Sequence, residues 1–333
     1  MEIERVPSMK GKITLEEHFA LPETFTSTTR FSKKGMGEDL RHRLMDLQGD
    51  RLREMDQFGI EFAIQSLNSP AVQAVPNVTE AIVLAQRAND VLANEVVKRP
   101  DRLAGFAALP MQDPEAAIEE MKRCIRDLGF VGVNVNGFSQ RENQNSLVYY
   151  DVPEFRPFWA VVEELEIPFY LHPRNPLTDQ MPFFDGHPWF TNSPWAFALE
   201  TAMHTLRLMG SGLFDDFPNL QLIVGHLGER IPFDLWRLDH RLKKSPQGIP
   251  AKKTMREYMC NNIHLTTSGQ FYDPPLHLAM HEVGVERIMF SVDYPFETTE
   301  DACRWFDSAE LSDKDRRAIG RNNAISLFSL NLN

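Results

Sequence analysis

Cysteine is scarce in this sequence: its 333 residues include only Cys124, Cys260 and Cys303. They lie far apart and lack CxxC spacing, which excludes a disulfide framework and argues against a thiolate metal site. Basic residues are outnumbered as well, with 35 Lys and Arg against 47 Asp and Glu and a formal net charge of −12. A surface for nucleic acid or an anionic membrane, which requires clustered cations, is therefore not expected.

Long apolar runs are also missing. No run approaches the roughly 18 residues that a membrane-spanning helix requires. The first residues, MEIERVPSMKGK, mix charges and lack the apolar stretch of a signal peptide. We therefore expect a soluble protein of the cytoplasm that does not act at a membrane.

Strand-like and helix-like segments alternate from end to end. Eight apolar segments are candidate strands: Lys12–His18, Glu61–Asn68, Leu103–Pro110, Val131–Asn136, Pro168–His172, Leu220–His226, Asn262–Thr267 and Arg287–Val292. Helical patterns lie between them: Thr79–Arg99, Pro114–Leu128, Glu154–Glu166, Trp195–Gly212, Ile231–Lys243, Pro274–Val283 and Asp313–Leu327. This alternation predicts parallel βαβ units. The fold class is α/β, and eight strands match a (β/α)8 TIM-type barrel that forms one domain over residues 1–333; an open doubly wound sheet is the main alternative.

Local signals refine this prediction. Asp113 and Asp273 each precede a proline, a pattern typical of an N-cap followed by the first helical turn. Two long insertions follow the first and fifth strands, Thr24–Gly49 and Asn175–Pro194. The second insertion is rich in aromatic residues. It could pack as a satellite cluster or subunit contact, or form an apolar wall over a flat substrate, and the sequence leaves both readings open.

Polar side chains end several of the apolar segments. They are Glu16, His18, His172, His226, Glu229 and Asp293. Active sites of parallel barrels are assembled at the carboxyl ends of several strands, so this placement favours the barrel and predicts a site there.

Glu16 and His18 are two residues apart in a predicted strand, so both side chains face one side while Glu17 faces the other. With His172 and Asp293 they would supply two carboxylates and two imidazoles. This donor set suits one divalent metal, zinc in first place, with manganese or magnesium as alternatives. A single histidine at a strand end is more often structural than a ligand; the joint placement on several strands is what predicts a metal site.

Four segments carry a resemblance to a known family: LEEHFALPE, YLHPR, IVGHLGERIPFDLWRLDHR and MFSVDYPFE. The chain resembles the amidohydrolase superfamily, in the branch of aminocarboxymuconate-semialdehyde decarboxylase and the dihydroxybenzoate (gamma-resorcylate) decarboxylases. Its ExH motif, in place of the HxH of most members, fits that branch. The fourth strand ends with Asn134 and Asn136 rather than lysine, so a carbamylated lysine between two metals is not expected.

The resemblance implies a metal-dependent carboxy-lyase that needs no organic cofactor. The expected substrate is a small ortho-hydroxylated aromatic acid, with 2,3-dihydroxybenzoate, converted to catechol and CO2, favoured over the 2,6-isomer. Without redox chemistry, the reaction should reverse at high bicarbonate. The alternatives are a metal-dependent hydrolase of a lactone or amide, and a barrel that only binds aromatic acids. Related decarboxylases are dimers or tetramers, so we expect a homodimer or homotetramer.

The chemistry suggests a role for each remaining residue. We expect Asp293 to protonate the ring carbon, and His226 and Glu229 to manage protons beside it; Glu229 could instead only cap the following helix. Asn136 could hydrogen-bond a ring hydroxyl or satisfy local backbone groups. Arg237 could belong to a surface ion-pair cluster; the resemblance implies instead that its guanidinium binds the substrate, in its own or a neighbouring subunit.

Overall fold

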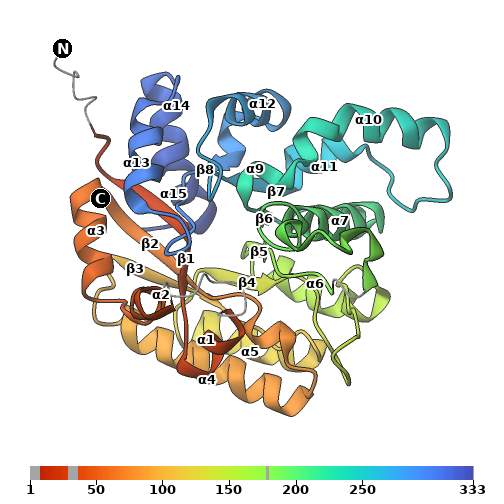
Figure 1. The fold of residues 1–333 in the computed structure, drawn as a ribbon. Coiled ribbons are helices and arrows are strands. Elements are labelled where there is room, and N and C mark those ends of the chain that lie inside the picture. Colours follow the sequence, from red (N-terminus) through yellow and green to blue (C-terminus); the bar gives the residue numbers. More distant parts are fainter. Residues whose placement is uncertain (1–7, 29–36, 178–179, 333) are drawn as a thin grey trace.

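Eight parallel strands form the centre of the molecule, in the order β1 to β8 around the sheet (Figure 1). The structure is a computed structural model that describes residues 8–28, 37–177 and 180–332. The strands are β1 Lys12–Phe19, β2 Ile60–Leu67, β3 Leu103–Ala107, β4 Gly132–Asn136, β5 Phe169–His172, β6 Leu222–Val224, β7 Ile263–Thr266 and β8 Ile288–Met289. Each predicted strand is present, and the prediction of a TIM-type α/β barrel is confirmed.

The barrel closes between β1 and the segment that follows β8. The backbone N–H of His18 donates to the Tyr294 carbonyl at 2.7 Å, and that of Asp293 donates to the Glu16 carbonyl at 3.1 Å. These bonds place the chain after β8 beside the carboxyl end of β1. The first and last parts of the sheet therefore meet where the predicted site residues lie.

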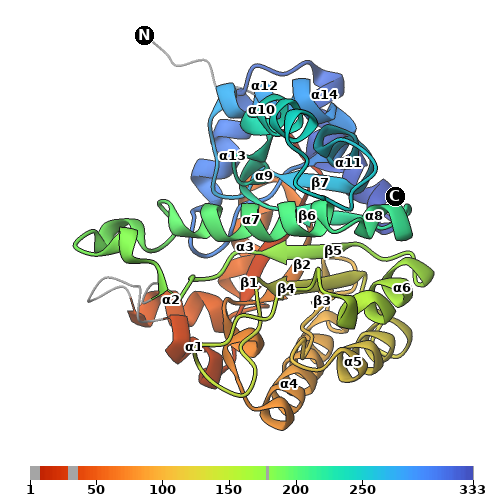
Figure 2. The same ribbon diagram turned by 90° about the vertical axis from the view of Figure 1, so that its right-hand side faces the viewer.

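Helices surround the strands, as the two views in Figures 1 and 2 show. The longer α-helices are α2 Gly37–Met45, α3 Asp50–Phe58, α4 Val78–Val96, α5 Pro114–Arg126, α6 Arg156–Glu164, α7 Ala196–Gly210, α10 Ile231–Lys244, α11 Met255–Asn262, α12 Asp273–Val283 and α13 Thr299–Ser308. Shorter helices are α1 Pro22–Thr28, α8 Leu213–Asp216, α9 His226–Glu229, α14 Asp313–Arg317 and α15 Asn323–Phe328. Short turns complete the set: η2 Ala71–Ala74, η3 Pro153–Phe155, η5 Pro182–Phe184, η6 Pro188–Phe190, η7 Val285–Arg287 and the π-helical η8 Ala318–Asn322.

The strands are buried on both faces, which explains their nearly continuous apolar sequences. In β4, Val133 and Val135 pack in the main core between sheet and helices. The inner face of the barrel contains a separate apolar cluster that includes Ile64, Phe106 and Tyr170. Polar groups are concentrated above this inner cluster, at the carboxyl ends of the strands.

The two predicted helix caps differ in outcome. Asp113 caps α5, because its side chain accepts hydrogen bonds from the N–H groups of Glu115 and Ala116. The prediction for Asp273 is wrong. It is the first residue of α12, and its carboxylate instead accepts from the Trp305 indole N–H at 2.7 Å and the Glu310 N–H at 3.0 Å. The Asp273 carboxylate thus binds two distant residues instead of capping the start of its own helix.

The insertion after β1 contains α1 and α2 in its described parts; residues 29–36 lie outside the described range. The insertion after β5 contains η5 and η6 and extends away from the barrel at the left of Figure 2. Phe184 is buried there, while Phe183, Trp189 and Phe190 are exposed. In the described ranges, no helix has the length and apolar character needed to cross a membrane.

Candidate metal centre

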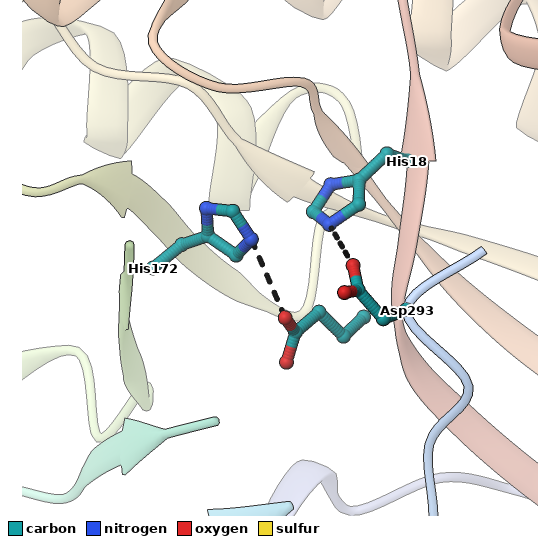
Figure 3. Close-up of side chains that lie close together, drawn as sticks. His18, His172 and Asp293 are labelled. Carbon is teal, nitrogen blue, oxygen red and sulfur yellow. Dashed lines mark ion pairs between the residues drawn. The ribbon is translucent and has the colours of Figure 1, made fainter. Parts of the chain in front are cut away.

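The structure brings the four predicted ligands together. Each of Glu16, His18, His172 and Asp293 offers one ligand atom, and these atoms all lie within 4.8 Å of one another. Figure 3 shows His18 and His172 entering the site from different strands and Asp293 turning toward His18. Glu16, His18 and His172 are buried, and the Asp293 side chain is 16 % exposed, so the cluster retains access for a small molecule.

Glu17, which separates the two β1 ligands, is not part of this cluster. Its carboxylate accepts hydrogen bonds from Ser291 Oγ at 3.3 Å and the Val292 N–H at 3.2 Å. Burial raises the pKa of Glu17 to about 8, against the lowering effect of the Arg51 charge. The structure therefore separates Glu17 from Glu16 and His18, as the period of two predicts for a strand.

Three hydroxyl groups fix the orientation of Glu16. Tyr170, Thr266 and Ser268 all donate to its Oε2, Thr266 at 3.2 Å. Its Oε1 is buried without a hydrogen-bond partner and lies 3.3 Å from His172 Nε2. One carboxylate oxygen is thus held by the protein while the other remains free for a ligand.

The protonation of the cluster suits a cation. Burial tends to raise the pKa of Glu16, but the neighbouring histidines, His226 first among them, outweigh it and hold that pKa well below its ordinary value. Burial lowers the pKa of His18, which favours the neutral imidazole that binds metals. His18 Nδ1 is paired with Ser66 Oγ at 3.0 Å, while its buried Nε2 has no hydrogen-bond partner and points to Asp293 Oδ1 at 3.3 Å. Buried oxygen and nitrogen atoms that lack hydrogen-bond partners and converge in this way are suitable ligands for a divalent ion.

Asp293 reaches the cluster through an unusual backbone conformation. Its φ is +76°, in the left-handed region that aspartate tolerates better than most residues. Phe296 follows, and its ring lies 5.6 Å from that of His18. The turn after β8 therefore aims a carboxylate back into the barrel mouth beside an aromatic ring.

His226 and Glu229 form the expected pair. His226 Nδ1 lies 2.7 Å from Glu229 Oε1, and its Nε2 lies 3.7 Å from both Glu16 Oε1 and Asp293 Oδ2. Burial would lower the pKa of His226, but Glu229 and Glu16 outweigh it and raise that pKa well above its ordinary value. Gly269 leaves room for the ring, since a Cβ there would lie 2.9 Å from His226 Cδ2. The GHLGE segment thus places a charged imidazole next to the candidate ligands.

The two predicted substrate-binding residues lie in different places. Asn136 ends β4 in register with His172 and is buried. Its Nδ2 donates to the carbonyls of Leu67 and Asn68, and its Oδ1 has no partner in the described part of the chain. Arg237 lies on the exposed side of α10, beside a groove of about 480 Å³ between α7 and α10. The structure does not bring Arg237 to the cluster of its own chain.

The hydroxyl groups that hold Glu16 were not predicted from the sequence. Tyr170 precedes His172 by two residues on β5, so the strand period could have pointed to Tyr170, whereas Thr266 and Ser268 share no strand with a predicted ligand. Their contact with Glu16 depends on barrel closure, which no local pattern shows.

Comparison with known proteins agrees with this geometry. The chain matches the amidohydrolase family over residues 18–330. The chain belongs to this family. The gamma-resorcylate decarboxylase of Rhizobium sp. (strain MTP-10005) is 53% identical over 324 residues, 97% of this chain and 99% of that protein. The predicted membership of the superfamily and of this branch is confirmed.

Solved structures give the same result. A 2,6-dihydroxybenzoate decarboxylase in complex with 2,6-dihydroxybenzoate has a TM-score of 0.95 at 53% identity, covering 97% of this chain and 100% of that one. A dihydroxybenzoic acid decarboxylase from Polaromonas sp. JS666, with bound manganese and the inhibitor 2-nitroresorcinol, has a TM-score of 0.95 at 50% identity, covering 97% of this chain and 98% of that one. The prediction that this chain is a carboxy-lyase is confirmed.

Proposed function

We propose that this enzyme decarboxylates 2,6-dihydroxybenzoate to resorcinol and CO2, rather than the 2,3-isomer favoured by the sequence analysis. The support is the similarity over 97% of the chain to proteins named for the 2,6-isomer, one of them in complex with it. Both ortho positions of this substrate carry a hydroxyl. One hydroxyl can therefore lie beside the carboxylate at the cluster while the other faces a different wall of the site.

The observation that carries the proposal is the convergence of Glu16, His18, His172 and Asp293, with ligand atoms within 4.8 Å of one another. We propose that these residues hold one divalent ion, manganese rather than zinc, because a relative of 50% identity binds manganese. Such an ion would hold the substrate carboxylate and an ortho oxygen together and favour ionisation of that hydroxyl.

Decarboxylation of an aromatic acid requires a proton at the ring carbon that bears the carboxylate. In the proposed mechanism Asp293 delivers it, and the ring loses its aromaticity while the ortho oxygen becomes a ketone. The carbon–carbon bond to the carboxylate then breaks, its electron pair returns to the ring, and CO2 leaves. Each turnover consumes one proton and neither oxidises nor reduces the substrate, so the reverse carboxylation is expected at high bicarbonate.

His226 is positioned to supply that proton again. Its Nε2 lies 3.7 Å from Asp293 Oδ2, and Glu229 holds the opposite nitrogen at 2.7 Å. We propose that the pair keeps the imidazole oriented toward Asp293 and restores its proton after each turnover.

Two contacts complete the proposed substrate site. Asn136 can accept a hydrogen bond from the second ring hydroxyl, because its Nδ2 is occupied by backbone carbonyls and its Oδ1 is not. Arg237 is exposed on α10, so a substrate contact from it would be made to the site of a neighbouring subunit. This proposal requires a homo-oligomer.

A substrate panel tests the proposed function. The metal-loaded enzyme is incubated without oxidant with 2,6-dihydroxybenzoate, 2,3-dihydroxybenzoate and a panel of lactones and amides, and CO2 and the aromatic product are measured. We expect CO2 and resorcinol in equal amounts from the 2,6-isomer, at a higher kcat/KM than for the 2,3-isomer. Preference for the 2,3-isomer, or hydrolysis without CO2 release, would overturn the proposal.

A further inference from the structure

Arg174, two residues beyond His172, is a buried arginine whose hydrogen bonds go to backbone and amide oxygens rather than to a carboxylate. Its side chain is 3 % exposed. Nη1 donates to the carbonyls of Phe138 at 2.7 Å and Gln73 at 3.1 Å, and Nη2 donates to Gln140 Oε1 at 3.0 Å. The guanidinium also lies 4.0 Å from the centre of the Phe138 ring. One side chain therefore joins the segment after β4 to the η2 turn after β2.

These bonds lead directly to Asn136. The Gln73 side chain accepts from the backbone N–H of Asn136 at 3.2 Å, and its Nε2 donates to the Leu109 carbonyl at 2.8 Å. Arg174 donates to the backbone carbonyl of Gln73, whose side chain binds the Asn136 N–H. It also donates to the carbonyl of Phe138, two residues beyond Asn136. The end of β4 is held between the two contacts.

Packing restricts the same segment. Gly137 has a φ of +61°, and a Cβ there would lie 2.5 Å from Arg174 Cγ and 3.0 Å from Glu200 Oε2. The chain after Asn136 thus turns tightly under the Arg174 side chain, with Glu200 of α7 also against it. The backbone beyond Asn136 is thus restricted, and its Nδ2 is bonded to the carbonyls of Leu67 and Asn68, so the amide has little freedom to turn.

We infer that Arg174 is a positioning residue, which holds Asn136 so that its Oδ1 receives the second ortho hydroxyl of the substrate. Arg174 would thereby set the preference for an acid with hydroxyls at both ortho positions over one with a single ortho hydroxyl. This inference rests on the proposed function. A guanidinium suits the role because its planar donors reach several acceptors at once, which lysine cannot reproduce.

The test compares two ligands that differ by one hydroxyl. KM is measured for 2,6-dihydroxybenzoate and the inhibition constant for salicylate, in the native enzyme and in Arg174→Met, Arg174→Lys and Gln73→Leu. Loss of one well-aligned hydrogen bond should weaken binding of 2,6-dihydroxybenzoate about fivefold. Salicylate lacks the second hydroxyl, so its inhibition constant should change less than about twofold by the same reasoning.

Arg207→Met is the matched control. Arg207 pairs with Asp151 at 2.9 Å and lies 4.3 Å from the Tyr149 ring centre, so it also combines a polar and an aromatic contact, but its side-chain hydrogen bonds go to Asp151 and not to Gln73, Asn136 or Phe138. It should leave the ratio of the two constants unchanged. In an Asn136→Ala background, Arg174→Met should have no further effect on that ratio, because the acceptor is already absent.

The outcomes separate the two claims. A native enzyme that releases no CO2 from 2,6-dihydroxybenzoate overturns the proposed function and this inference with it. Native turnover with equal weakening of both ligands in the variants overturns the inference alone, since a merely structural role predicts that result. If Arg174→Met does not fold, Gln73→Leu replaces it. That variant keeps the arginine and removes the link to Asn136, and the ratio of KM for 2,6-dihydroxybenzoate to the inhibition constant for salicylate again tests the inference.

Discussion

His18 Nε2 lies 3.3 Å from Oδ1 of Asp293, so the first strand and the segment after the last strand meet at one pair of side chains. The backbone bonds between His18 and Tyr294 and between Asp293 and Glu16 hold the same two segments together. Closure of the barrel therefore also assembles the candidate metal centre. A substitution within the cluster should affect metal binding more than folding, because the backbone bonds remain.

His172→Ala should remove metal and activity together while the barrel stays folded. We expect activity to fall by at least about 100-fold, the upper end of the loss caused by removing a group that only supports a metal ligand. Metal analysis, CO2 release and circular dichroism test this expectation. His264→Ala is the matched control, because His264 is also a buried strand histidine but is bonded to Gln221 and lies outside the cluster. A metal-free variant that remains active would refute the assignment.

Asp293→Asn should abolish decarboxylation and its reversal. Asparagine tolerates the left-handed backbone found at this position, so the substitution removes the acid with little change to the turn. Loss of a general acid typically costs about 10²- to 10⁴-fold in rate. The measurement is CO2 release and exchange of ring protons of resorcinol in D2O, on protein shown to contain metal. A metal-replete variant with near-native rates would assign the acid role elsewhere, with His226 the next candidate.

Glu200→Gln should stabilise the protein increasingly as the pH rises. Burial, reinforced by Glu229 and only partly opposed by Arg174, raises the pKa of Glu200 from 4.5 to about 8. Between these values the native state keeps a proton that the unfolded state has lost, so the native protein loses stability with rising pH. The variant has no carboxylate to lose this proton. Its free energy of unfolding should therefore exceed that of the native protein by an amount that grows by on the order of 1 kcal/mol per pH unit up to about pH 8. Urea unfolding of both proteins at several pH values measures the difference; a difference that does not vary with pH would show that Glu200 is not buried in its neutral form.

The purified protein should contain more than one chain in a closed assembly. Phe233 and Trp236 on α10 are 73 % and 68 % exposed, and Trp189 in the insertion after β5 is 59 % exposed, which is more apolar surface than a monomer usually leaves open. Light scattering at micromolar concentration should give the mass of a dimer or tetramer, and Trp236→Glu should reduce it. Val97→Glu, at an equally exposed position after α4, should not. A native monomer would contradict this prediction and also the proposed role of Arg237.

Much of this architecture could be predicted because it depends on local patterns. The strands are short apolar runs, and Glu16 and His18 share a face because a strand repeats every two residues. His172 and Asp293 could be added because parallel strands end on one side of a barrel. These rules concern the order of elements and need no knowledge of long-range contacts.

The features that could not be predicted from the sequence depend on contacts between distant segments. The hydroxyls of Tyr170 and Ser268 become significant only when β1 lies beside them, and serine and tyrosine are too common to indicate a site alone. Asp273 resembles a helix cap in sequence but pairs with Trp305 in space. Arg174 has no distinctive spacing, and its role depends on three acceptors in two segments, Gln73 in η2 and Phe138 and Gln140 after β4.

Titration of the metal-free enzyme with manganese tests the central claim most directly. Metal is removed with a chelator, Mn²⁺ is added in steps, and CO2 release from 2,6-dihydroxybenzoate is followed without oxidant. A single site formed by Glu16, His18, His172 and Asp293 predicts no activity before addition and a plateau at one ion per chain. Full activity in the metal-free protein, or a plateau that requires two ions per chain, would contradict a decarboxylase built on one metal centre.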